Sequence, residues 1–124
     1  MSSHSDTQIF DCDLDTAAQA CRFAFKLMQL MVNRDSGKTF EANEKFKLAS
    51  FTNPAKLNVN LSVDGNRTSI GVKSSNLGYG PIQGGHVRGV AETLFSNIRL
   101  QLSNNGASAR EVREKSNFSA DDLI

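Results

Sequence analysis

A strict alternation of apolar and polar residues near the middle of the chain constrains its fold more than any other feature. Between residues 57 and 63 every second residue is apolar, in the order Leu57, Asn58, Val59, Asn60, Leu61, Ser62 and Val63. After the turn sequence Asp64-Gly65-Asn66, the alternation resumes in residues 68–74. Because successive side chains of a strand point to opposite faces, this pattern predicts an antiparallel hairpin with one apolar and one polar face.

Two stretches with helical spacing flank this hairpin. The first follows the N-cap candidates Asp13 and Asp15, and its apolar stripe is Ala17, Ala20, Cys21, Ala24, Leu27, Met28 and Met31. The second runs from about His86 and stops before Asn104-Asn105-Gly106, with the stripe Val87, Val90, Ala91, Leu94, Phe95, Ile98 and Leu102. Each stripe predicts an amphipathic helix that packs one side on a core.

Shorter strands complete the pattern. Residues 7–12 suggest an opening strand, preceded by a disordered N-terminus that contains His4. Residues 31–34 and 38–42 suggest a hairpin with Gly37 in its turn, and residues 44–51 a further strand that ends before Asn53-Pro54. The order is strand, helix, four or five antiparallel strands, helix. This predicts a two-layer α+β domain over residues 1–106, with both helices on the apolar face of the sheet.

The order of elements resembles that of TATA-binding-protein-like folds and of small helix-grip folds, a likeness of topology that does not fix a function. Residues 107–124 are polar and are expected to form a tail or linker. Ser119 and Asp122 form a helix-capping pattern within this tail, followed by Leu123-Ile124. This run resembles the start of the SHOCT (short C-terminal) domain of bacterial proteins. The resemblance implies the N-terminal domain of a longer bacterial protein, with a role in oligomerisation or other protein contacts and no catalytic residues to carry over.

Composition narrows the function classes. The chain has 124 residues, 39% of them apolar, and a formal charge of +1, which fits one globular domain and argues against nucleic-acid binding through bulk charge. Neither a signal peptide nor a membrane-spanning segment is recognisable, so a cytoplasmic location is expected. Cys12 and Cys21 are expected to be reduced and structural. The cysteines and histidines lack the spacing of a zinc site, and we predict no metal and no cofactor.

The glycine-rich segment before the second helix is the one candidate binding site, although its spacing matches neither of the common phosphate-binding glycine motifs. Its residues, with two polar residues at the expected helix start, are Gly78, Tyr79, Gly80, Gly84, Gly85, His86 and Arg88. Backbone N–H groups at a helix start can bind an anion, but an ordinary strand-to-helix linker explains the segment as well. His86 lacks a nucleophile or an orienting partner in the sequence pattern, so a solvent-facing or capping role is expected rather than catalysis.

These observations leave two hypotheses. The leading one is a non-enzymatic domain that acts through protein contacts or self-association. The alternative is a helix-grip module that binds a small apolar or anionic ligand, with the glycine-rich segment as the rim of its site. The apolar residues that could line a cavity, or equally fill a plain core, are Met28, Met31, Phe40, Phe46, Phe51 and Phe95. Nucleic-acid binding comes third, because the polar sheet face offers only Lys56, Arg67 and Lys73.

Overall fold

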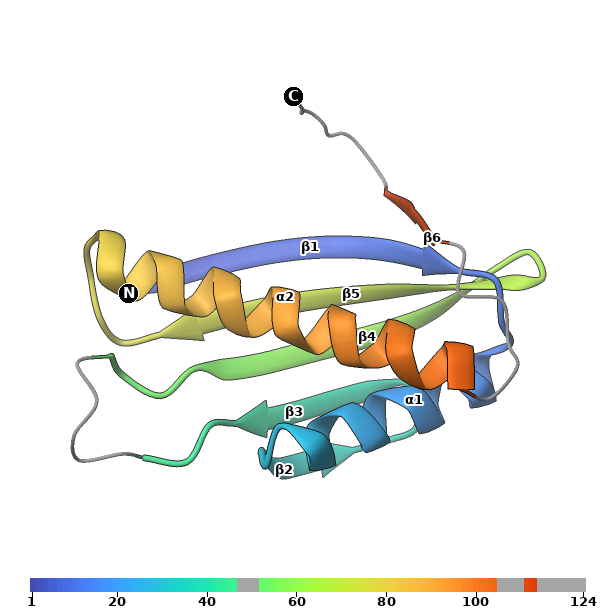
Figure 1. Cartoon of the computed structure of the whole chain (residues 1–124), viewed down its shortest axis with the longest axis horizontal. Coiled ribbons are helices and arrows are strands. Elements are labelled where there is room, and N and C mark those ends of the chain that lie inside the picture. Colours follow the sequence, from blue (N-terminus) through green and yellow to red (C-terminus); the bar gives the residue numbers. More distant parts are fainter. Residues whose placement is uncertain (47–51, 105–110, 114–124) are drawn as a thin grey trace.

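The structure is a computed structural model that describes residues 1–46, 52–104 and 111–113. Its elements follow one another as β1 (Ser2–Phe10), α1 (Leu14–Leu27), β2 (Met31–Asp35), β3 (Thr39–Asn43), β4 (Lys56–Asp64), β5 (Arg67–Asn76), α2 (Pro81–Asn104) and the short β6 (Glu111–Arg113). Figure 1 shows the strands as one sheet with both helices lying across it. The predicted two-layer α+β architecture is confirmed.

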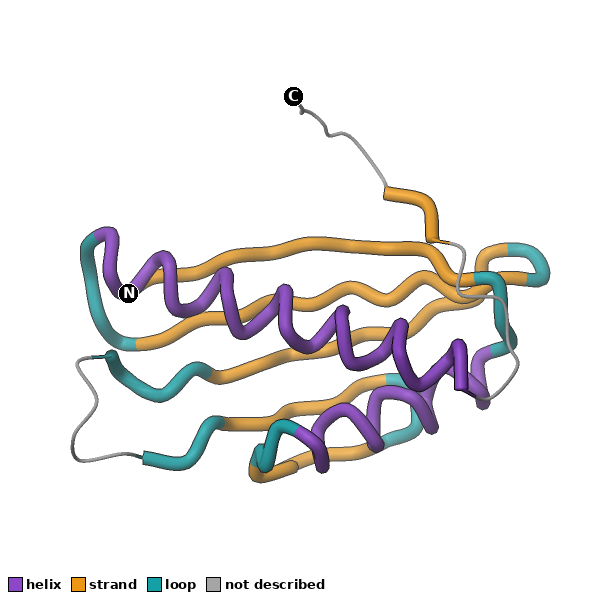
Figure 2. The backbone as a smooth tube through the Cα atoms, viewed as in Figure 1, coloured by secondary structure: helices purple, strands orange, loops and turns teal. Residues whose placement is uncertain are grey.

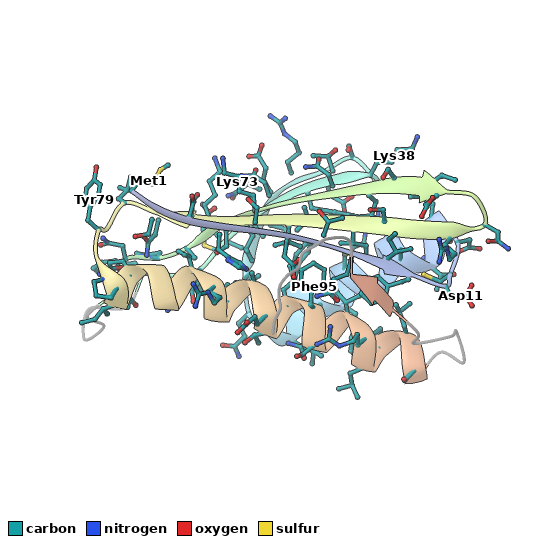
Figure 3. All side chains as sticks on the ribbon, turned by 90° about the horizontal axis from the view of Figure 1, so that it is seen from above. Met1, Asp11, Lys38, Lys73, Tyr79 and Phe95 are labelled. Atoms are coloured by element: carbon teal, nitrogen blue, oxygen red, sulfur yellow. The ribbon has the colours of Figure 1, made fainter. Side chains whose placement is uncertain are left out.

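The sheet is antiparallel throughout, with the strand order β2-β3-β4-β5-β1-β6. The hairpin predicted from the alternating pattern is the pair β4 and β5, and β5 also pairs with β1 over its whole length. Both helices cover the same face of the sheet, as the view from above in Figure 3 shows. The helix-covered side is called the inner face below, and the opposite side the outer face.

The core lies between the helices and the inner face. Phe25 of α1 meets Phe40 of β3 edge to face, with ring centroids 5.5 Å apart. Phe95 of α2 stacks on Phe10 of β1 at 6.4 Å. All four rings are buried, so Phe40 and Phe95 fill the core rather than line a cavity. Of the other residues considered for a cavity, Met28 packs partly buried against the core, Met31 and Phe46 are exposed, and Phe51 lies outside the described residues.

The first helix begins as predicted and ends early. The carboxylate of Asp13 caps it by accepting a hydrogen bond of 2.8 Å from the N–H of Thr16. Hydrogen bonds from the side chain of Thr16 and from this N–H lower the pKa of Asp13. The helix was expected to include Met31 but ends at Leu27, because Gln29 takes a left-handed conformation with φ of 57°. Met31 therefore opens β2 instead of extending the helix stripe.

Other boundaries also differ from the expectation. The N-terminus is not disordered: β1 begins at Ser2, and its register with β5 pairs His4 with Ser74. Helix α2 begins at Pro81, five residues before the predicted start. Residues 44–46 are not in a strand, and the rest of the strand expected there lies outside the described residues. Within the predicted tail, β6 pairs with β1. The residues that resemble a SHOCT domain also lie outside the described part of the chain.

Candidate functional site

The predicted rim residues lie at one end of the sandwich, where β5 leads into α2. Gly78 is buried there: its N–H donates to Asn76 Oδ1 at 3.3 Å, and its carbonyl accepts from the Ser2 hydroxyl at 2.9 Å. Tyr79 is 82% exposed and lies close to Met1 in the view of Figure 3. The segment is therefore fixed to the start of β1, while its aromatic side chain is free to meet a ligand or partner.

The other rim residues belong to α2 or to its immediate start. Gly80 has a φ of 94°, a left-handed conformation that suits glycine, directly before the helix. Gly84 and Gly85 were expected in a loop but lie in the first turns of the helix, where an added methyl group would meet nothing within 4 Å. Arg88 is exposed, and in the described part of the chain no hydrogen bond joins it or His86 to Tyr79.

His86 is held by a carboxylate rather than left in solvent. Its Nε2 lies 2.5 Å from Oε1 of Glu44, and each side chain is about one quarter exposed. The same carboxylate oxygen accepts a hydrogen bond of 2.9 Å from the N–H of Ala55, whose carbonyl in turn accepts one from the N–H of Glu44. Glu44 therefore joins both ends of the connection between β3 and β4 to the beginning of α2.

A set of amides extends this contact across the end of the sheet. Gln83 Oε1 accepts from the N–H of Asn53 at 3.0 Å and from Nδ2 of Asn76 at 2.9 Å. Asn76 Nδ2 also donates to the carbonyl of Asn53 at 3.2 Å. We call Glu44, Asn53, Asn76, Gln83 and His86 the end cluster. It connects β5, α2 and the β3–β4 connection through polar contacts alone.

The inner face of β5 changes character as it approaches the end cluster. Ile70 and Val72 are buried apolar residues, whereas Ser74 and Asn76, next on the same face, are polar and also buried. Ser74 is 0% exposed, and its hydroxyl has no hydrogen-bond partner among the described residues. Nearly all buried polar atoms in proteins are hydrogen-bonded, so the Ser74 hydroxyl is unusual. Asn43 Oδ1, at the same end of the sheet, is the other buried side-chain atom without a partner among the described residues.

The helices diverge toward this end. Figure 2 shows the end of α2 beside the start of α1, and the start of α2 well separated from the end of α1. A small pocket of about 70 Å³ opens at the end of α1, and its lining residues are Met28, Gln29, Leu30, Glu44 and Lys45. Glu44 therefore lies between this opening and His86. The pocket is lined by the end of α1 and by residues 44 and 45, and the neighbouring inner-face residues of the sheet are buried.

Most residues of this site could not be identified from the sequence. His86 was a candidate, but its partner Glu44 is far away in the chain. Asn76 and Gln83 were included in the expected glycine-rich connection, although the alternation of β5 continues to Asn76. A signal for the true helix start was present in Pro81, since proline is common at the first position of a helix. Asn53 had no distinguishing signal.

The groups that could carry metal or thiol chemistry lie elsewhere. Cys12 and Cys21 are free and buried. Burial is the main cause that raises the pKa of Cys21 to about 12 and that of Cys12 to about 11, with the nearby Asp13 carboxylate contributing to the second. Among the described residues, no three His, Cys, Asp or Glu side chains gather closely enough to hold a metal ion. In the same part of the chain, neither helix has the length and apolar character needed to cross a membrane.

Comparison with known proteins supports the fold. No family model matches this sequence, and no curated protein matches it. The solved structure of Ara h 8.0201 superimposes with a TM-score of 0.54 over 82% of this chain and 98% of that chain, at 11% identity. CalU16 from Micromonospora echinospora superimposes with a TM-score of 0.53 over 84% of this chain and 78% of that chain, at 12% identity.

Both structures have helix-grip folds, in which a curved antiparallel sheet holds a long helix. The chain therefore has a helix-grip fold, as its order of elements suggested. At such low identity the similarity concerns the fold alone.

Proposed function

We propose that this chain is a small-ligand-binding module that acts by binding and not by catalysis. The ligand is held between α2 and the inner face of the sheet, at the end where the two helices diverge. The observation that carries the proposal is the hydroxyl of Ser74, which is fully buried beside the end cluster without a hydrogen-bond partner among the described residues. The helix-grip fold supports it, because this fold places a long helix across one face of a curved sheet.

The energetics of Ser74 indicate the chemistry of the ligand. A buried hydroxyl without a partner costs about 1–3 kcal/mol. A ligand that carries one hydroxyl or carbonyl group recovers this free energy when it bonds to Ser74. The neighbouring inner-face residues Leu57 and Val72 are buried and apolar, so they favour an apolar body. We therefore expect a small apolar molecule with a single hydrogen-bonding group.

The polar groups of the end cluster support a binding role. The carboxylate of Glu44 already accepts from Ala55 and contacts His86, so it holds the β3–β4 connection against α2. The two thiols remain protonated at neutral pH and are buried in the core. In this proposal the end cluster surrounds the place where the ligand enters. Glu44 and His86 have a structural role there and do not act as an acid–base pair.

A pair of serine variants tests the proposal. Native mass spectrometry of the purified chain looks for a co-purified small molecule, and a thermal-shift screen of apolar alcohols and ketones looks for stabilising compounds. A stabilising compound should bind Ser74→Ala about tenfold more weakly, since one buried hydrogen bond is lost. The control is Ser69→Ala, which lies on the outer face of the same strand and should bind normally. The proposal is contradicted if the mass spectrum shows the protein alone and no compound raises its melting temperature. It is also contradicted if Ser74→Ala and Ser69→Ala weaken ligand binding equally.

Self-association is the second candidate function, and exposed apolar side chains around the start of α2 favour it. Leu77, Tyr79 and Ile82 are 81%, 82% and 67% exposed. They lie within one segment of six residues, so their apolar surfaces are close together in the chain. Such side chains gain free energy when a second copy of the chain covers them. Sedimentation should show a dimer that is lost when all three are changed to serine. A wild-type chain that stays monomeric at high concentration contradicts this second function.

A further inference from the structure

The outer face of the sheet carries a second concave site, separate from the inner-face site proposed above. It is a pocket of about 360 Å³ at the end of β4 and β5, and its lining residues are Met1, Pro54, Lys56, Asn58, Lys73, Ser75, Asn76 and Leu77. Its volume lies at the lower end of the range of small-molecule sites. Figure 3 shows Lys73 pointing away from the helices, at the same end as Met1 and Tyr79.

The strand register explains why two lysines meet in this pocket. Lys56 lies opposite Ser75, and Asn58 lies opposite Lys73, on two neighbouring strands. The residues between them in sequence, Leu57 and Ser74, are buried on the inner face, so both lysines and their partners face outward. Lys56 and Lys73 are therefore diagonal neighbours, with Cβ atoms about 7 Å apart. Both ammonium groups can reach a single anionic group placed between them.

Among the described residues, no carboxylate lies directly opposite either lysine on a neighbouring strand. The residues beside Lys56 on the two adjacent strands are Asn43 and Ser75, and those beside Lys73 are Asn58 and Ser5. Neither lysine makes an ion pair within the described residues. The lining of the pocket contains no carboxylate side chain. Glu41 lies on the same face, opposite Asn58 and diagonal to Lys56, but its carboxylate pairs with Arg34 at 3.8 Å. The two lysine charges therefore repel each other until an anion binds.

Three arginines of the same sheet and of α1 show the opposite arrangement. Arg22 pairs with Asp35 at 2.7 Å, Arg67 with Asp64 at 3.4 Å and Arg34 with Glu41 at 3.8 Å. Each of these cations has a carboxylate within salt-bridge distance. Unlike these three arginines, the two lysines have no carboxylate partner among the described residues. Both lysines line the outer-face pocket.

The edge of the pocket is apolar. Met1 and Leu77 line it and are 58% and 81% exposed. Asn58 and Ser75 supply hydrogen-bonding side chains on the floor, between the two lysines and along the strands. A ligand that matches this arrangement has one anionic group over the strands and a short apolar body toward the end of the molecule.

From this juxtaposition we infer that the outer-face pocket binds a small organic anion, in which a carboxylate or phosphate group lies between Lys56 and Lys73 and a short apolar chain contacts Met1 and Leu77. The bound group replaces the repulsion between two ammonium ions by two charge-assisted hydrogen bonds. Asn76 belongs both to the end cluster and to the lining of this pocket. The two binding groups are nevertheless distinct, because Lys73 and Ser74 are adjacent residues of one strand and face opposite sides of the sheet.

Titration calorimetry of the full chain with hexanoate and hexyl phosphate tests the inference, with hexan-1-ol as the neutral probe. We expect both anions to bind and the alcohol not to bind. Lys73→Met and Lys56→Met keep the aliphatic stem, and each should weaken binding about tenfold because one charged hydrogen bond is lost. The matched control is Lys38→Met, an exposed lysine in the β2–β3 turn that should leave the affinity unchanged. Chemical shifts of the Asn58 and Ser75 amides should move on binding.

Several results overturn the inference. One is binding of hexan-1-ol as tightly as hexanoate, and another is equal affinity in Lys73→Met and wild type. Binding to anionic vesicles without binding of either soluble anion also overturns it, because a membrane surface would then be the partner. Ser74→Ala separates the two proposals: it should leave anion binding unchanged, so the outer-face site can fail or hold independently of the inner-face site.

Discussion

At the scale of single residues, the buried hydroxyls of β5 differ in their hydrogen bonding, and the buried thiols differ from free thiols in their pKa. Thr68 and Ser74 are both fully buried on the inner face of β5. The hydroxyl of Thr68 donates to the carbonyl of Cys12 at 2.9 Å, whereas that of Ser74 has no partner among the described residues. Two similar groups on one strand therefore contribute to stability with opposite signs.

This difference predicts how two conservative substitutions change the free energy of unfolding without ligand. Ser74→Ala removes an unpartnered hydroxyl, so the stability should stay the same or rise by up to about 1 kcal/mol. Thr68→Val removes a bonded hydroxyl of the same strand and should cost about 1 kcal/mol. Urea unfolding followed by circular dichroism measures both. Equal losses in the two variants would mean that Ser74 is already satisfied in the free protein.

The thiols give a prediction about pH. Since burial raises the pKa of Cys12 to about 11 and that of Cys21 to about 12, both stay protonated in the fold when free thiols ionise, near pH 8.5. The folded state then binds more protons than the unfolded state, so the contribution of the thiols to stability falls as the pH rises from about 8.5 to 11. Iodoacetamide at pH 8.5 should label both cysteines rapidly in guanidinium and slowly in the native chain, with Cys21 the slower. Rapid labelling of the native chain would show that the thiols are accessible.

At the scale of elements, the sequence predicts those parts whose periodicity reflects burial on one face. The β4–β5 hairpin and the stripe of α2 appear as expected, because each buries an apolar face. The stripe of α1 is confirmed as far as Ala24, but Leu27 is 51% exposed and Met31 lies in β2. The length of strand β1 was underestimated, because residues 2–6 are polar on both faces and show no alternation. The strand forms through its pairing with β5, which involves nine residues. The end cluster could not be foreseen, since common polar residues from distant segments form it.

Glycines inside α2 explain why its start was placed too late, and they provide a prediction. A glycine in a helix interior costs about 1 kcal/mol relative to alanine. At Gly89 an added methyl group meets nothing within 4 Å, so Gly89→Ala should raise stability by about 0.4–1 kcal/mol. The contrasting variant is Gly80→Ala, which should destabilise the fold because φ is 94° there. Thermal unfolding measures both, and a lower midpoint for Gly89→Ala contradicts this account of the helix.

At the scale of the whole molecule, β5 organises the fold. It pairs with β4 and β1, its inner face meets the helices, and its outer face carries Lys73. Adjacent residues of this strand thus belong to two different candidate sites, one on each side of the sheet. A binding event at either site acts on a strand that belongs to the core. Each ligand should therefore stabilise the whole domain and not only its own end.

Two aromatic pairs test whether the domain unfolds as one unit. The Phe25–Phe40 contact joins α1 to β3, and the Phe10–Phe95 contact joins α2 to β1, on opposite sides of the shared strands β4 and β5. Because these pairs belong to one continuous core, Phe40→Ala and Phe95→Ala should each cost about 3–5 kcal/mol. Both should lower the midpoint of a single transition, with helix and strand amides losing protection together in native-state hydrogen exchange. Loss of protection in α2 alone after Phe95→Ala, with the sheet and α1 still protected, would show that the long helix unfolds separately.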